Sequence, residues 1–344
     1  MDRKFLLFLL TAVIAATLAA CSPADGSASE GNGAAGELII YSGRNEELVS
    51  PLIERFEEES GIEVGVRYGD TAEMAATILE EGENSPADVF FGQDAGALGA
   101  LAEAGRLTEL PDEVLNRVDS RFRSPDGQWV GTSGRARVVA YNKAAVSPAD
   151  LPDSIYGFTD PAWQGRIGWP PTNGSFQSAL TAMRVLDGEE AAREWVEGIL
   201  ANDPVTYPSN SVALEAVAAG EVDVAFINHY YLFRALAEQG DDYGADIYFL
   251  PGGDAGALVN VAGAGVVDST DQPEAAEQFI RFLLSEESQQ YFSETTFEYP
   301  LVDGIPADSR LPALSEIQTP QIDLGDLSDL EGTLELLQET GALE

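Results

Sequence analysis

Short apolar segments alternate with amphipathic segments along most of this chain, and this alternation constrains the fold more strongly than any other feature. Each of three strand-like segments is followed by a segment whose apolar residues recur at helical spacing. The strand-like segments are residues 37–41, 62–66 and 87–91, and the helix-like segments are residues 48–56, 74–81 and 94–105. This β-α-β-α-β-α order predicts a parallel sheet covered by helices.

The same alternation restarts after a long predicted strand over residues 135–142. Further strands are predicted at residues 166–169, 222–227, 247–250 and 258–267, and helices at residues 175–186, 189–200, 211–219, 230–238 and 274–288. A chain of 344 residues is long enough for two lobes. We therefore expect an α/β protein with two sheets, strands that cross between them, and a cleft.

Charge and rare residues exclude several classes of function. The chain has 18 Lys and Arg against 59 Asp and Glu, a formal net charge of -41, which argues against nucleic-acid binding and against docking on anionic lipid through a basic patch. Cys21 and His229 are the sole residues of their types, which argues against a disulfide framework, His-rich metal sites and a His-dependent catalytic centre. The Asp and Glu residues are spread along the whole chain, which is typical of proteins adapted to high salt; the alternative is an ordinary acidic exported protein.

The N-terminus is typical of an export signal. Residues 1–20 combine a short basic start with an apolar run over residues 5–20, and Cys21 follows directly. This arrangement resembles a bacterial lipoprotein signal, in which cleavage precedes the cysteine and the cysteine is lipidated; the alternative is an ordinary signal peptide in which Cys21 is incidental. Residues 21–36 are rich in Ser, Gly and Ala, which predicts a flexible tether.

Candidate binding residues lie in the loops that follow strands, because open α/β sheets bind ligands beyond the carboxyl ends of their strands. Tyr230 and Tyr231 directly follow the predicted strand 222–227. Paired tyrosines are usually packing residues, but a phenolate is a hard oxygen donor that suits Fe3+, and a strongly charged metal can displace the phenolic proton. Residues 171–175 precede one helix and Asn210 starts another. Each loop alone is most simply an ordinary helix cap, but if both line the cleft, their backbone amides could together hold a small anion.

The chain resembles the periplasmic ferric-ion-binding proteins, the substrate receptors of bacterial iron ABC transporters, over about residues 37–302. The motifs that carry the resemblance are residues 41–46 (YSGRNE), 56–62 (FEEESGI), 86–91 (PADVFF), 134–142 (GRARVVAYN), 171–174 (PTNG), 210–217 (NSVALEAV) and 227–231 (INHYY). The resemblance implies that Tyr230 and Tyr231 ligate Fe3+. It also implies that a synergistic anion such as phosphate or carbonate is held by Asn173, Gly174, Asn210 and Asn228.

The fold implied by the resemblance is a two-lobed type 2 periplasmic binding protein, with two mixed sheets flanked by helices and a hinge of crossing strands. The first lobe would comprise residues 37–137 plus 261–310, and the second would comprise residues 138–260 plus 311–344. The crossings would lie in residues 135–142 and near Asn260.

The chain departs from the family at two expected ligand positions. Some members have a histidine where this chain has Asn45 and a glutamate where it has Gln93, and both replacements are poor Fe3+ ligands. Glu46 and Asp94 follow directly and could substitute, although ordinary solvated acids are the simpler interpretation. His229 is expected to point away from the metal, because it alternates with Tyr230. A third family tyrosine is replaced by Phe176.

The function implied is that of a lipid-anchored, monomeric receptor that delivers ferric iron to the permease of an ABC transporter and catalyses no reaction. An alternative is a receptor on the same scaffold for another small anionic solute, phosphorylated or carboxylated, that needs no metal. An exported hydrolase has little support, since the sequence has no Gly-x-Ser-x-Gly motif and cannot supply a pair of histidines.

Overall fold

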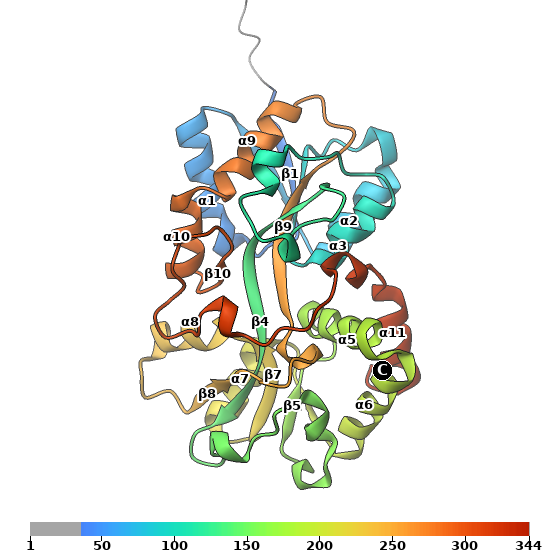
Figure 1. Ribbon diagram of the computed structural model, residues 1–344, viewed down its shortest axis with the longest axis vertical. Coiled ribbons are helices and arrows are strands. Elements are labelled where there is room, and N and C mark those ends of the chain that lie inside the picture. The colour runs from blue at the N-terminus through green and yellow to red at the C-terminus, as the bar shows by residue number, and fades with distance from the viewer. Residues whose placement is uncertain (1–35, 344) are drawn as a thin grey trace, which may run out of the picture. The chain divides into compact units, whose positions relative to one another are not determined.

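The computed structural model describes residues 36–343, and its longest strand, β4 (Val130–Asn142), takes part in two regions of sheet. The signal segment, Cys21 and the tether up to residue 35 lie outside the described residues. Figure 1 shows one group of elements around each end of β4, and β9 (Val259–Val266) pairs with β4 where the two groups meet.

The first sheet region contains the predicted parallel strands. β1 (Leu38–Ser42) lies between β2 (Val64–Tyr68) and β3 (Val89–Gly92), and both pairings are parallel. β9 then pairs antiparallel with β3 and β4, and β10 (Tyr299–Pro300) pairs antiparallel with β4. The sheet is therefore mixed, with its parallel part at the N-terminal end of the chain.

Helices flank this region on two sides (Figure 1). α1 (Glu46–Ser60) packs with α9 (Pro273–Leu283), and α2 (Thr71–Glu81) packs with α3 (Ala95–Glu103). The remaining helices of the region are α4 (Asp112–Leu115) and α10 (Glu286–Glu294). The prediction of one helix over residues 274–288 was wrong, because α9 ends at Leu283 and the side chain of Ser285 caps the start of α10.

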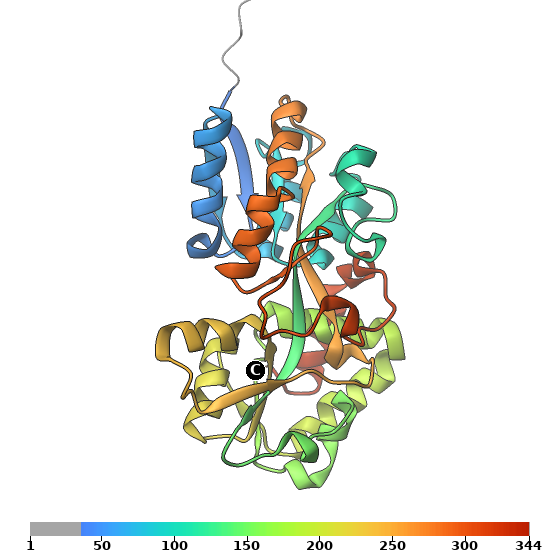
Figure 2. The same ribbon diagram turned by 60° about the vertical axis from the view of Figure 1, so that its left-hand side comes forward.

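The second sheet region is also mixed. β7 (Val224–Asn228) and β8 (Ala245–Tyr248) pair antiparallel with β4, while β5 (Ile167–Trp169) pairs parallel with β7 and with β6 (Val205–Thr206). Its helices are α5 (Gly174–Asp187), α6 (Glu189–Ala201), α7 (Asn210–Ala219) and α8 (Tyr230–Gln239). β4 and β9 run side by side between the two groups in both Figure 1 and Figure 2.

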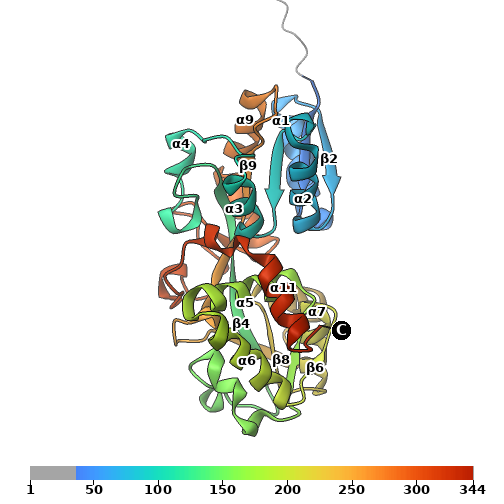
Figure 3. The same cartoon turned by 90° about the vertical axis from the view of Figure 1, so that its right-hand side faces the viewer.

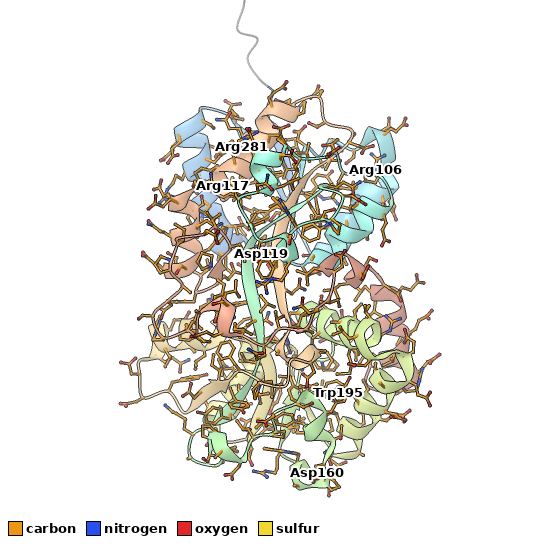
Figure 4. The ribbon with its side chains drawn as sticks, viewed as in Figure 1. Arg106, Arg117, Asp119, Asp160, Trp195 and Arg281 are labelled. Carbon is orange, nitrogen blue, oxygen red and sulfur yellow. The ribbon has the colours of Figure 1, made fainter. Side chains whose placement is uncertain are left out.

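Each region has its own cluster of aromatic side chains. In the first, Phe279 contacts Phe56 and Phe91 edge-on, with ring centroids 5.1 and 6.2 Å apart. In the second, the ring of Trp195, labelled in Figure 4, lies between Phe176 and Phe226. Such pairs add about 0.5–1.5 kcal/mol each beyond the burial of their area. Phe176, which replaces the third tyrosine of some family members, is therefore a packing residue.

The C-terminal residues contact both groups, which the sequence pattern did not predict. A 3-10 segment over Leu324–Ser328 packs against α3, and α11 (Leu330–Glu339) packs against α5 (Figure 3). We call residues 324–339 the C-terminal strap. The contact with α3 requires glycine, because a Cβ at Gly96 would lie 2.3 Å from the Leu327 carbonyl oxygen. None of the helices within residues 36–343 is long and apolar enough to span a membrane.

Candidate functional site

A cleft of about 780 Å³ is lined by residues from both groups of elements. Its polar lining includes residues from four of the loops expected from the sequence: Asn45 after β1, Gln93 and Asp94 after β3, Asn173, Gly174 and Ser175 after β5, and Tyr230 and Tyr231 after β7. Arg135 of β4 lies among them. The strand ends that the sequence analysis singled out therefore converge on one cavity.

Tyr230 and Tyr231 form the aromatic part of the cleft wall. They are the first two residues of α8, and their rings stack with centroids 4.3 Å apart. Tyr230 is buried and Tyr231 is half-buried. Burial, followed by the neighbouring Tyr231, raises the pKa of Tyr230 well above its usual value, so its phenol keeps its proton at neutral pH in the absence of a cation.

His229 is fully buried and is not among the cleft-lining residues. The amide of Ala136 donates to its Nδ1 at 3.1 Å, and its Nε2 lies 2.9 Å from the carbonyl oxygen of Phe297. Because a carbonyl can only accept, the proton is on Nε2. Burial lowers the pKa of His229 to about 4, which keeps the ring neutral. Both ring nitrogens have partners in the protein, in line with the expectation that His229 points away from the cleft.

The residues expected to hold an anion are joined in one hydrogen-bonded network. The Oδ1 atom of Asn173 accepts from Ser175 Oγ at 2.6 Å and from Asn210 Nδ2 at 2.8 Å. Arg137 Nη1 donates to Asn228 Oδ1 at 3.1 Å and to Ser175 Oγ at 3.4 Å. Asn173 and Gly174 line the cleft, whereas Asn210 and Asn228 are buried behind them and are not among the lining residues.

The N-terminus of α5 presents backbone to the cleft. Asn173 caps the helix: the amide of Ser175 donates to its side chain, and those of Phe176 and Gln177 donate to its carbonyl. A Cβ built on Gly174 would meet no atom of residues 36–343 within 4 Å, so the first residue of the helix faces open space. The first amides of a helix lack partners within the helix and attract anions.

The loops after β1 and β3 contribute neutral side chains and one acid. Thr71 joins the loops, because its hydroxyl accepts from the amide of Gln93 and donates to the carbonyl of Gly43. The Oε1 atom of Gln93 is buried without a partner among the described residues. Asp94 caps α3, and burial raises its pKa. Asn45 is exposed and lines the cleft, whereas Glu46 is exposed at the start of α1 and does not line it.

Two buried arginines, Arg135 and Arg137, were not identified from the sequence. Burial lowers the pKa of Arg137 to about 10, so it stays charged at neutral pH, and both guanidinium groups would attract a phenolate on Tyr230. Alternate residues of a strand lie on the same face. Arginines at alternate positions of the otherwise uncharged segment 130–142 were the signal that could have identified them. Among residues 36–343, no group of three or more His, Cys, Asp or Glu is placed to hold a metal ion.

Residues 51–319 match the family model of the bacterial extracellular solute-binding proteins. The major ferric iron-binding protein of Neisseria meningitidis serogroup B is 33% identical over 333 residues, which cover 96% of this chain and 97% of that protein. The chain belongs to the periplasmic ferric-ion-binding proteins.

Solved structures of this family share its fold. Iron-bound HitA from Pseudomonas aeruginosa superimposes with a TM-score of 0.83 at 36% identity, covering 89% of this chain and 99% of that one. A Trichodesmium protein in complex with iron and citrate ligands gives a TM-score of 0.78 at 30% identity, with coverage of 89% and 99%. The predicted type 2 periplasmic binding protein fold is therefore confirmed, and the periplasmic ferric-ion-binding proteins are non-enzymatic components of transport.

Proposed function

We propose that this chain binds Fe3+ in the cleft through the phenolate oxygens of Tyr230 and Tyr231. The observation that carries the proposal is the stacked tyrosine pair at the start of α8, which lines the cleft next to a buried cation, Arg135. Phenolates are anionic oxygen donors, and a trivalent ion acidifies the groups that it binds. Ferric iron would be the cargo of the protein.

A small oxyanion, phosphate or carbonate, would complete the shell of the iron. Two phenolates leave most positions of a six-coordinate ion open, and Asn45 and Gln93 are neutral at positions where other members supply ligands. Asn173 and the amide of Gly174 offer donors at the positive end of α5. Three buried residues that do not line the cleft would orient the side chains of Asn173 and Ser175 through hydrogen bonds: Arg137, Asn210 and Asn228.

Delivery would depend on closure and opening of two lobes, residues 37–137 plus 261–310 and residues 138–260 plus 311–344. The lobes would move about β4 and β9, which run between the two groups of elements. The protein would work as a monomer, held at the cell membrane by a lipid on Cys21, in the periplasm or at the outer face of the cytoplasmic membrane. It would release iron to the permease of an ABC transporter. Tethering would keep the receptor near its permease.

The test is a visible spectrum of the purified protein with Fe3+ and phosphate or carbonate. Phenolate coordination gives a phenolate-to-iron charge-transfer band, so the solution should be coloured, and removal of iron with a strong chelator should remove the colour. A protein that stays colourless under these conditions contradicts the proposal.

Incubation of the full chain in cells with labelled palmitate tests the lipid anchor, and a Cys21→Ser variant should take up no label.

A second candidate is a metal-independent receptor for a small anionic solute. Arg135 in the cleft, Arg137 behind it and the open N-terminus of α5 favour anion binding with or without iron. Thermal-shift measurements separate the two candidates. An organic phosphate or carboxylate that stabilises the metal-free protein, where Fe3+ does not, would favour the second.

A further inference from the structure

Glu298 is a fully buried carboxylate on the chain just before β10. It forms a two-pronged ion pair with Arg44, whose Nη1 lies 3.1 Å from Oε1 and whose Nη2 lies 2.7 Å from Oε2. The hydroxyl of Ser133 donates to Oε2 at 3.1 Å, whereas that of Thr296 lies 3.1 Å from the same oxygen and 2.9 Å from the carbonyl oxygen of Phe292, which share its one proton. Three donors, two from Arg44 and one from Ser133, thus fix the carboxylate in one orientation, and its charged form is favoured.

The same carboxylate faces the arginine of the cleft. Arg135 Nε lies 4.0 Å from Glu298 Oε1 and is buried without a hydrogen-bond partner among the described residues. The other end of the guanidinium, Nη2, donates to the carbonyl of Gln93. Arg135 lines the cleft together with Tyr230, and its charge favours the phenolate of that tyrosine against the effect of burial. Arg135 is therefore held by one hydrogen bond on the cleft side and by the opposite charge of Glu298 behind it.

Phe297, the residue before Glu298, contacts the chain at the start of α8, where Tyr230 lies. Phe297 has a φ of +59°, and its carbonyl oxygen lies 2.9 Å from Nε2 of His229, the residue before Tyr230. Residues 297 and 298 therefore contact both the start of α8 and the arginine that faces Tyr230. A left-handed backbone costs energy for a residue other than glycine or asparagine, so the surrounding contacts must hold it in place.

We propose that Glu298 is a positioning residue for the ligand site: it holds Arg135 at the cleft wall, where the guanidinium attracts the anion bound with iron. The inference rests on the proposed binding of Fe3+. The physical reason is repulsion between Arg44 and Arg135, which the carboxylate between them offsets. Without Glu298, Arg135 would move away from Arg44, and its charge would no longer lie at a fixed distance from Tyr230 and the anion.

The experiment uses the full chain with Fe3+ as the probe, in the presence and absence of inorganic phosphate. Affinity is measured by competition with a chelator, and the charge-transfer band is recorded. The variants are Glu298→Gln and the double variant Arg44→Gln with Glu298→Gln. The double variant removes both members of the ion pair, so it leaves no unpaired charge at Arg44 and replaces the single variant if that one fails to fold. The control is Asp88→Asn, since Asp88 is a buried carboxylate that bonds Ile39 and Thr270, outside the cleft lining.

We expect Glu298→Gln to bind Fe3+ about 10- to 100-fold more weakly in phosphate, as for other partners that orient metal ligands. The double variant should lose less affinity, because Arg44 no longer repels Arg135. Phosphate should also increase the affinity of both variants by a smaller factor than in the unmodified protein, and Glu298→Asp should restore part of that factor. Asp88→Asn should lower the melting temperature. It should leave the Fe3+ affinity, the charge-transfer band and the gain in Fe3+ affinity with phosphate unchanged. Glu298 variants with unchanged affinity and phosphate effect would overturn the inference, whereas an unmodified protein without a band would overturn the proposed function itself.

Discussion

The rings of Tyr230 and Tyr231 stack with their centroids 4.3 Å apart and 28° between their planes. Both rings belong to the first turn of α8, and both line the cleft. A stacked pair of adjacent phenols is a preformed arrangement, so the protein itself contributes the geometry of these two oxygens before any ion arrives.

Replacing either tyrosine by phenylalanine should remove one phenolate and keep the ring. We expect Tyr230→Phe and Tyr231→Phe each to weaken the charge-transfer band strongly, and the double variant to abolish it. The stack survives, so the free energy of unfolding should change by less than about 1 kcal/mol. The matched control is Tyr243→Phe, a buried tyrosine outside the cleft lining. Full colour in the double variant would exclude both phenols as ligands.

Iron affinity should increase with pH. Burial, and then the neighbouring Tyr231, raises the pKa of Tyr230, so Fe3+ must displace a proton that the phenol holds firmly. Each proton released on binding makes the apparent affinity rise about tenfold per pH unit. Competition with a chelator of known proton dependence between pH 5.5 and 8 measures this slope. Tyr230→Phe should give a shallower slope, and a pH-independent affinity in the unmodified protein would contradict the prediction.

A carboxylate at position 93 should strengthen the site. Gln93 lines the cleft with the tyrosines, and its Oε1 is buried without a partner in the described part of the chain. Gln93→Glu adds an anionic oxygen beside Arg135, and we expect Fe3+ affinity to rise about tenfold, or about 1.4 kcal/mol. Gln93→Asn remains neutral and should show no gain. An unchanged affinity for Gln93→Glu would place this side chain out of reach of the ion.

Stability should fall as the pH drops below the ordinary pKa of histidine. The folded protein lowers the pKa of His229 to about 4, whereas an unfolded chain protonates it near about 6.5. Between these values the unfolded state binds more protons, so the free energy of unfolding decreases by about 3 kcal/mol from pH 6.5 to 4. Urea unfolding at several pH values measures it. His229→Asn can still accept from Ala136 and should lose most of this dependence in that window.

The C-terminal strap should depend on small residues of α3. A Cβ at Gly96 would lie 2.3 Å from the Leu327 carbonyl oxygen, so Gly96→Ala should displace the strap and lower the free energy of unfolding by about 1–3 kcal/mol. The control is Gly36→Ala, where the nearest atom would lie at an ordinary 3.4 Å. Thermal unfolding distinguishes them, and equal melting temperatures would show that the strap is not held at this contact.

Much of the fold could be predicted from the spacing of apolar residues, because a half-buried strand or helix places apolar side chains at a regular interval along the sequence. The parallel order of β1, β2 and β3 and the positions of α5, α6, α7 and α8 all agreed with it. The pattern failed where packing overrides it. β4 begins at Val130 instead of residue 135, since the Gly- and Ser-containing start of the strand is held by pairing with β9.

For the site, the sequence alone determined which residues follow strands, and so which side chains could meet: Tyr230, Tyr231, Asn173, Gly174, Gln93. Only the tertiary structure decided how they are supported. Arg44 and Glu298 are 254 residues apart in the chain, and His229 and Phe297 are 68 apart. Local periodicity carries no information about such pairs, because a buried charge is defined by the partners that surround it after folding and not by its neighbours in sequence.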